Sequence, residues 1–288
     1  MGLIARKDEM PANHNNQKKI ALINDYTGFG RCSVAVQLPV ISQLKVQCCT
    51  LPTSILSNHT GFESFTLFDY TPLMEAYIAE WRKLDLQFNG ICTGFLGSAE
   101  QVRIVQDFIR EFGESAQVVV DPVMGDYGRP YATYTPEMCA GMREIVRHAD
   151  ITTPNLTEAC ILLEEPYADD MSEARISELA QKLTELGPAK VVITGIPRGD
   201  TMSNFCCEAG QAPYRITYER TGGDCSGTGD VFSAIIAADA VNGVPFRRSV
   251  ERGAEFVGKC IEASQRLGIP NTDGVAFEEV LYRLSTQD

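Results

Sequence analysis

Hydrophobic positions follow two alternating periods along the chain. From Lys19 onward, short β-branched runs alternate with longer segments in which apolar residues recur at helical spacing. This alternation is typical of βαβ units, which build an α/β fold with a mostly parallel sheet. The predicted strands cover residues 19–24, 46–51, 90–93, 118–121, 151–153 and 191–194. The predicted helices cover residues 31–44, 98–112, 136–148, 171–186, 231–242, 247–267 and 276–284.

The pattern changes after Thr194, where two short consecutive segments predict a hairpin. Residues 202–208 and 213–218 are its expected strands, and they would close one edge of the sheet. The sequence has no internal repeat and no linker rich in Pro, Gly or Ser. We therefore predict one domain over residues 19–288, preceded by a mobile arm over residues 1–18.

Composition and charge restrict the kinds of partner. The formal net charge is −13, which argues against nucleic acid as a ligand, although backbone N–H groups at a helix N-terminus still bind phosphate. The ten cysteines include no Cys-x-x-Cys pair and suit reduced thiols in a cytoplasmic protein. No apolar stretch reaches the length of about 20 residues that a membrane helix needs, so we expect no membrane partner.

A glycine-rich segment, Thr221–Asp230, directly precedes a predicted apolar helix. Its glycines let backbone N–H groups converge on an anion, and the helix N-terminus adds positive potential. Asp230 at the mouth of this loop could take a proton from a hydroxyl that attacks phosphate. The alternative is that Asp230 only caps the helix. The sequence therefore predicts an anion site and leaves the role of Asp230 open.

Further polar groups follow the ends of other predicted strands, where ligands bind in parallel sheets. Asn155 and Glu158 begin a helix, where they could hold hydrated Mg²⁺ with its phosphates or simply form a capping box. Asp121 ends a strand, and residues 126–134 after it form a predicted flap. The chain lacks a P-loop, and Gly28-x-Gly30 lacks the third glycine of a dinucleotide motif.

Six short segments together resemble the pyridoxal kinases of the ribokinase superfamily. They are SNHTGF at Ser57, GFLGSAEQ at Gly94, DPVMGD at Asp121, PNLTEA at Pro154, VVITG at Val191 and GTGD at Gly227. The resemblance runs from about Lys19 to the C-terminal helix. It implies a Rossmann-like three-layer α/β/α sandwich, in most members a homodimer, that transfers the γ-phosphoryl group of ATP to the 5′-hydroxyl of a B6 vitamer with Mg²⁺.

The same resemblance assigns roles to individual residues. It implies that Asp230 is the general base, that Gly227, Thr228 and Gly229 form the anion hole, and that Asn155 and Thr194 contact ATP. Glu158 and Asp121 would be the acids on the metal side. Thr53 and His59 match polar positions of the vitamer pocket, and Phe95 falls where the family commonly has Tyr.

Two features bear on the branch of the superfamily. Sugar kinases insert a small β-lid after the first strand, whereas this chain is expected to run from Asn24 through one helix to the strand at Val46. Asp25 occupies a place where pyridoxal kinases typically carry Ser. A carboxylate there would attract the ammonium group of pyridoxamine; alternatively, it accepts a hydrogen bond from a hydroxyl or a pyridine N–H group.

Several alternatives stay open. A hydroxymethylpyrimidine or phosphomethylpyrimidine kinase of thiamine synthesis shares the fold, although that family typically carries Cys where Asp230 stands. A bifunctional kinase, a catalytically silent vitamer-binding protein and a nicotinamide oxidoreductase are further candidates. The sequence also leaves open the preferred vitamer, the use of a monovalent cation, the dimer interface and whether Cys225 is reactive or only packs.

Overall fold

A nine-stranded sheet forms the centre of the computed structural model, which describes residues 15–285. The strand order is β11-β10-β9-β8-β5-β4-β1-β2-β3, and β6 and β7 form a separate ribbon. The strands are β1 Lys19–Phe29, β2 Gln47–Asn58, β3 Leu67–Asp69, β4 Gly90–Thr93, β5 Gln117–Val120, β6 Gly125–Asp126, β7 Arg129–Pro130, β8 Ile151–Thr152, β9 Lys190–Arg198, β10 Thr201–Glu208 and β11 Tyr214–Glu219.

Six adjacent strands of the sheet, from β9 to β2, run parallel, and β3, β10 and β11 pair antiparallel at the two edges. The helices are α1 Val34–Gln43, α2 Thr71–Lys83, α3 Ala99–Phe112, α4 Pro136–Arg147, α5 Leu156–Leu163, α6 Glu173–Leu186, α7 Thr228–Asn242 and α8 Phe246–Leu267. The predicted α/β fold and the edge hairpin are confirmed.

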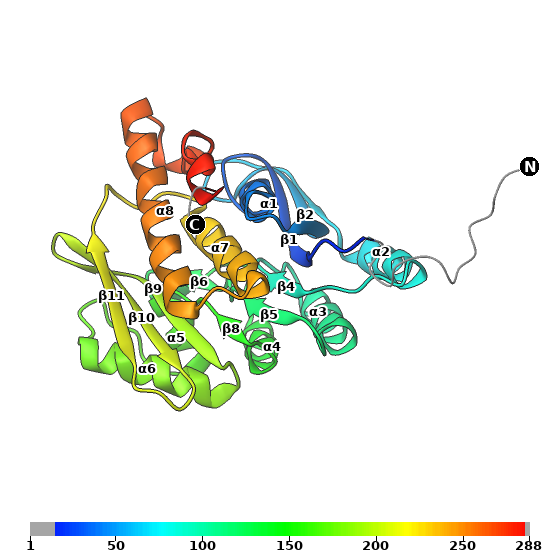
Figure 1. Ribbon diagram of the computed structural model, residues 1–288, viewed down its shortest axis with the longest axis horizontal. Helices are drawn as coiled ribbons and strands as arrows, with labels where there is room; N and C mark the ends of the chain where they lie inside the picture. Colours follow the sequence, from blue (N-terminus) through cyan, green and yellow to red (C-terminus); the bar gives the residue numbers. More distant parts are fainter. Residues whose placement is uncertain (1–14, 286–288) are drawn as a thin grey trace, which may run out of the picture.

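Helices cover both faces of the sheet and give a three-layer sandwich (Figure 1). Helices α2 to α6 pack on one face, and α1, α7 and α8 pack on the other. Strand β1 serves both layers, because Ala21 and Ile23 point to the first face while Ile20 and Leu22 point to the second. This is why the predicted strands are apolar at every position rather than at alternate ones.

The structure corrects several predicted boundaries. Strands β1 and β2 continue to Phe29 and Asn58, well past the predicted ends at residues 24 and 51, because their outer parts pair with each other and with β3. Helix α7 begins at Thr228 rather than at residue 231, and α1 begins at Val34. The predicted helix over residues 276–284 is wrong, since only short 3₁₀ turns occur there, and α2 was not predicted.

The segment before β1 contacts the domain where it is described. Lys19 is only 2% exposed, and its Nζ donates to the backbone oxygens of Asn15 and Gln17 and to Asn15 Oδ1. These contacts satisfy an ammonium group that would be costly to bury alone. Residues 1–14 of the predicted arm lie outside the described residues.

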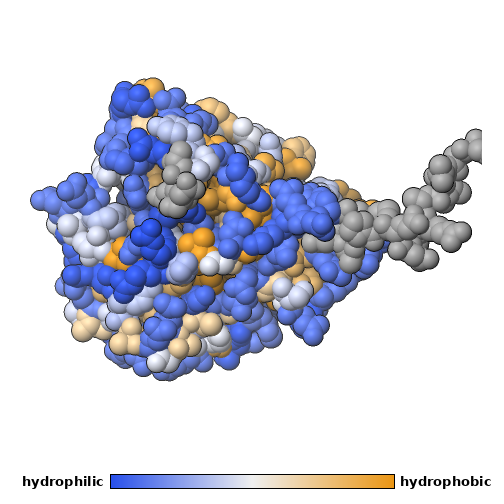
Figure 2. Space-filling model, in the orientation of Figure 1, coloured by the Kyte–Doolittle hydropathy of each residue, from blue (hydrophilic) through white to orange (hydrophobic). Residues whose placement is uncertain are grey.

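The surface view in Figure 2 is mostly hydrophilic, with hydrophobic side chains in small separate areas. Among the helices of residues 15–285, none combines the length and the apolar character needed to cross a membrane.

Candidate active site

The predicted site residues lie at the carboxyl ends of the parallel strands and at the start of α7. Asp25 lies in β1, Thr53 in β2, and Asp121 directly follows β5. Asn155 follows β8, and Thr194 lies in β9 beside it, because the two residues form a parallel bridge. Neighbouring parallel strands end at the same edge of a sheet, so the topology gathers residues that are far apart in sequence.

The glycine loop ends in a left-handed turn at Gly227, which is the N-cap of α7 and has a φ of 82°. A Cβ at this position would lie 1.8 Å from the carbonyl oxygen of Arg31, whereas a Cβ at Gly229 would meet no atom within 4 Å. Within the described residues, no side chain caps α7. The N–H groups of its first turn are therefore available to an anion, as expected for Gly227, Thr228 and Gly229.

Asp230 lies in the first turn of α7, but its carboxylate bonds to other elements. Oδ1 accepts a hydrogen bond from Asn24 Nδ2 at 3.2 Å, and Oδ2 accepts one from the backbone N–H of Ser33 at 2.8 Å. Loss of hydration and, to a lesser extent, the charge of Asp25 raise the pKa of Asp230 while these two bonds lower it, and the net result is a pKa of about 7. The group can therefore exchange a proton near neutral pH, which favours a base over a helix cap.

Two residues that hold this carboxylate were not predicted as functional. Asn24 is fully buried at the predicted end of the first strand. Ser33 has a φ of 54°, a strained value for a residue with a side chain, and its hydroxyl donates to Asp25 Oδ1 at 2.6 Å. The position of Asn24 at a strand end could have indicated a functional role for it. Nothing in the sequence indicates the strained backbone of Ser33.

Asn155 and Glu158 form the capping box that was one of their two predicted interpretations. Asn155 Oδ1 accepts from the Glu158 N–H at 2.9 Å, and Glu158 Oε2 accepts from the Asn155 N–H at 2.8 Å. Glu158 Oε1 also accepts from the Met124 N–H at 3.1 Å. These bonds fix the carboxylate and leave its remaining oxygen lone pairs open to a cation.

Asp121 couples the two other acids electrostatically. Burial and then the charge of Asp230 raise the pKa of Asp121, and burial and then the charge of Asp121 raise the pKa of Glu158. A hard divalent cation would relieve this repulsion, and Mg²⁺ needs few protein ligands because it keeps several waters. Among residues 15–285, no three His, Cys, Asp or Glu side chains converge into a metal cage. The two acids fit Mg²⁺ shared with phosphates.

Four residues were expected on the vitamer side, and the structure connects three of them. Thr53 is fully buried, and its hydroxyl donates to the Phe95 carbonyl at 2.9 Å. The N–H of Phe95 in turn donates to Asn24 Oδ1, next to Asp25. His59 lies further out, where Nε2 donates to the Thr272 carbonyl at 2.6 Å if Nδ1 accepts from the Gly61 N–H.

Asp25 is buried, with 5% exposure, and it already has partners. Its two oxygens accept hydrogen bonds from the hydroxyls of Ser33 and Thr27 at 2.6 and 2.9 Å. Burial raises its pKa, while these hydroxyls and the nearby His59 lower it. Asp25 therefore accepts from two hydroxyls of the chain itself, and both of its predicted roles toward the vitamer stay predictions.

The predicted flap contains the β6–β7 ribbon, which bridges α5 and the glycine loop. Asn155 Nδ2 donates to the Gly125 carbonyl at 2.9 Å, and the Gly128 N–H donates to Thr157 Oγ1 at 2.8 Å. At the tip, the Tyr127 hydroxyl donates to Asp224 of the glycine loop. The flap therefore spans both parts of the predicted phosphate site.

The reactive interpretation of Cys225 is not supported. Burial and the charge of Asp224 raise its pKa, which disfavours the thiolate. Its Sγ lies 3.6 Å from the Gly223 carbonyl and from Asn271 Oδ1, so the thiol has ordinary packing contacts.

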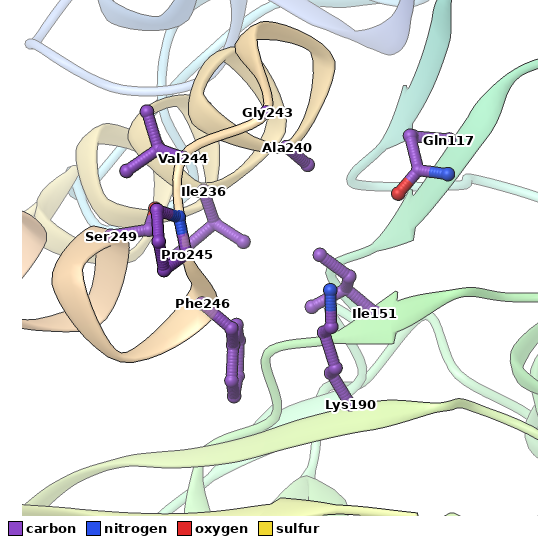
Figure 3. Close-up of a pocket in the computed structure, with 10 residues that line it drawn as sticks. All are labelled: Gln117, Ile151, Lys190, Ile236, Ala240, Gly243, Val244, Pro245, Phe246 and Ser249. Atoms are coloured by element: carbon purple, nitrogen blue, oxygen red, sulfur yellow. The ribbon is translucent and has the colours of Figure 1, made fainter.

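A cavity of about 290 Å³ lies at the amino ends of the parallel strands, opposite the candidate active site (Figure 3). Gln117, Ile151 and Lys190, which line it, are the first residues of β5, β8 and β9. Phe246 and Ser249 at the start of α8 complete its wall. The cavity is separated from the candidate active site by the length of the strands and contributes none of the residues discussed above.

Comparison with known proteins places the sequence among small-molecule kinases. Residues 34–274 match the phosphomethylpyrimidine kinase family. The hydroxymethylpyrimidine/phosphomethylpyrimidine kinase of Haemophilus influenzae is 28% identical over 75% of this chain and 82% of its own. The pyridoxine/pyridoxal/pyridoxamine kinase of Bordetella avium is 28% identical over 88% of this chain and 90% of its own.

One solved structure with the same fold is connected with both phosphomethylpyrimidine and pyridoxal. A Bacteroides thetaiotaomicron protein, described as a phosphomethylpyrimidine kinase, was crystallised in an orthorhombic form with pyridoxal. Its TM-score is 0.90 and its sequence identity 37%, over 95% of this chain and 97% of that protein.

Proposed function

Because this chain belongs to the phosphomethylpyrimidine kinase family, within the ribokinase-like superfamily, we propose that it uses ATP to phosphorylate the 5′-hydroxymethyl group of a B6 vitamer. The product is the vitamer 5′-phosphate. The observation that carries the proposal is the Asp230 carboxylate, which has a pKa of about 7 and lies in the first turn of an uncapped helix.

In the proposed reaction, Asp230 takes the proton of the vitamer hydroxyl as that oxygen bonds to the γ-phosphorus of ATP. The bond from the γ-phosphorus to the bridging oxygen breaks, and ADP leaves with that electron pair. The N–H groups of Gly227, Thr228 and Gly229 donate to the transferring phosphoryl oxygens. Asn155 and Thr194, side by side at the neighbouring strand ends, are the proposed ATP contacts.

Asp121 and Glu158 are the residues that would hold Mg²⁺. When bound there, the ion supplies positive charge that offsets the phosphate charge and the repulsion between the two carboxylates. The β6–β7 flap, bonded to Asn155 and to Asp224 through Tyr127, is the part that excludes water from the phosphates.

The substrate side separates two candidate kinases. Asp230 supports a B6 vitamer, because hydroxymethylpyrimidine kinases typically carry Cys at this place, and the similar Bacteroides protein was crystallised with pyridoxal. The Haemophilus relative supports the second candidate, phosphorylation of hydroxymethylpyrimidine or its phosphate. In either case, the side chains proposed to contact the substrate are those of Thr53, Phe95, His59 and Asp25.

The test is ADP release by the purified full chain with ATP and Mg²⁺. Pyridoxal, pyridoxine, pyridoxamine and hydroxymethylpyrimidine are compared side by side, with Asp230→Asn as the control for contaminating kinases. Turnover of any B6 vitamer above the pyrimidine supports the proposal. Turnover of the pyrimidine alone supports the second candidate, and no turnover of any of the four contradicts the proposal.

We also propose that the protein is a homodimer through the outer part of β1, β2 and β3. Tyr26, Ile55 and Phe68 are cross-strand neighbours there and form an apolar row, exposed by 49%, 40% and 66%. An exposed apolar row on a sheet edge favours burial against another surface, and a second copy offers an identical row across a two-fold axis. Sedimentation equilibrium of the full chain measures the association.

A further inference from the structure

Asn24 is the only described residue that hydrogen-bonds both to Asp230 and to the backbone of the vitamer side. Its Nδ2 donates to Asp230 Oδ1 at 3.2 Å and to Gln37 Oε1 at 2.8 Å. Its Oδ1 accepts from the N–H groups of Phe95 and Asp25 at 2.8 and 2.9 Å. The side chain is fully buried, so water does not compete for these bonds.

These four contacts permit only one orientation of the amide. An asparagine amide has two N–H donors and one oxygen with two acceptor positions, and all of them are used here. A flipped amide would place its NH₂ group against two backbone N–H donors and its oxygen against two acceptors. The orientation, and hence the donor on Asp230, is therefore fixed by the backbone of β1 and of the segment after β4.

Gln37 and Ser233 close this arrangement into a ring. Gln37 is fully buried, and its Nε2 donates to Ser233 Oγ at 3.2 Å, while Ser233 Oγ donates to the backbone carbonyl of Asp230 at 3.2 Å. Asn24, Gln37, Ser233 and Asp230 thus hold one another across β1, α1 and α7. The ring restrains both the side chain and the backbone of the proposed base.

Gly94 leaves the space that the Asn24 amide occupies. A Cβ built on Gly94 would lie 2.4 Å from Asn24 Cγ and Nδ2 and 2.6 Å from Oδ1. The amide therefore packs directly on the backbone that leads to Phe95, and little displacement is available to it.

We propose that Asn24 is a positioning residue, which keeps the Asp230 carboxylate at a set distance and orientation from the vitamer hydroxyl. One rigid amide connects the group that takes the proton to the segment that binds the substrate. Proton and phosphoryl transfer depend steeply on such geometry, and a misplacement of about 1 Å costs about 100-fold in rate. The inference rests on the proposed kinase function and on Asp230 as its base.

Asn24→Asp separates the donor from the acceptor half of the amide. The new side chain has nearly the same shape and keeps an oxygen for the N–H groups of Phe95 and Asp25. In its ionised form it has no donor for Asp230 and adds a like charge beside it, so its kcat is compared with that of the wild type at about pH 8.5, and the neutral variant Asn24→Ser is measured beside it. We expect kcat for the B6 vitamer to fall by about 100-fold while the vitamer KM and the affinity for ADP stay close to the wild-type values. Gln37→Met is the matched control, because it breaks the ring and keeps the bond from Asn24 to Asp230, so its kcat loss is smaller.

A merely structural Asn24 gives a different pattern. An unchanged kcat in Asn24→Asp, or a rise in KM that accounts for the whole loss of kcat/KM, overturns the inference. Asn24→Ser adds no charge, and its short hydroxyl does not reach Asp230, so the same split of kcat from KM is expected for it. This variant decides if Asn24→Asp fails to bind ADP or replaces the lost donor with its own protonated carboxyl. Asp230→Asn is measured in parallel. If this variant turns over normally, the assignment of Asp230 as base and the role of Asn24 both fail. If it is inactive while Asn24→Asp turns over normally, only the role of Asn24 is overturned.

Discussion

The acid limb of the pH profile is the most direct consequence of the environment of Asp230. A base must be ionised to accept a proton, and loss of hydration raises the pKa of this carboxyl from 3.8 to about 7. Because the folded pKa is raised, the active anion is lost as pH falls through about 7 rather than through about 4. The bonds from Ser33 and Asn24 limit this rise, since they favour the ionised form.

The size of the effect follows from the titration curve. With a pKa of about 7, roughly nine-tenths of the protein carries an ionised Asp230 at pH 8 and roughly one-tenth at pH 6. We therefore expect kcat/KM for the vitamer, which reports ionisations of the free enzyme, to fall by about tenfold between these two pH values.

The assay is the initial rate of ADP formation from about pH 5.5 to about pH 8.5, with Mg²⁺ fixed and with ATP and the vitamer well below their KM values. Under these conditions the rate reports the ionisation of the free enzyme, and any ionisation of the free substrates appears equally in Asp230→Asn. Asp230→Asn is the control, because its residual rate should lack this limb. A wild-type kcat/KM that stays flat down to pH 5.5, or a limb shared equally by Asp230→Asn, would refute the reasoning.

Two further predictions use substitutions in the same site. Gly227→Ala is expected to lower the free energy of unfolding by at least about 1–2 kcal/mol, because a left-handed residue with a Cβ costs that much and this Cβ would also meet a neighbouring carbonyl. Gly229→Ala is the control: its Cβ would lie in open space, so we expect unchanged stability and a lower kcat alone. Equal denaturation midpoints for the two variants would contradict the geometry. Asp25→Ser is expected to raise the KM for pyridoxamine more than that for pyridoxine, because only the amine loses an ionic partner; equal changes for both vitamers, measured by the same ADP assay, would show that the carboxylate serves its hydroxyl partners instead.

The parts of the fold that were predicted correctly depend on local pattern. Apolar runs located the central strands because both faces of the sheet are covered, and two short consecutive segments located the hairpin of β10 and β11. The outer halves of β1 and β2 were missed because their stability comes from pairing with each other and with β3, while Pro52 and polar residues there suggested strand ends. Helix α2 begins with Pro72 in its first turn, which the sequence also presents as a break.

The site shows the same division between local and long-range information. The capping box of Asn155 and Glu158 spans four residues and could be predicted as one of two interpretations. The bond between Asn24 and Asp230 joins positions 206 residues apart, and no local spacing indicates it. The positions of these polar residues at strand ends suggested that their side chains lie close together. The hydrogen-bond partner of each polar atom, however, depends on the tertiary packing of the complete domain.

That separation of 206 residues between Asn24 and Asp230 also has a consequence for how the protein reaches its working state. Contacts between distant parts of a chain form late in folding, because closing the long loop between them costs conformational entropy before the contacts can stabilise the structure. The first strand emerges early during synthesis, yet its asparagine has no acidic partner until α7 has been made and has docked. With the proposed roles of Asn24 and Asp230, catalytic competence therefore arises only when α7 has docked on the completed sheet.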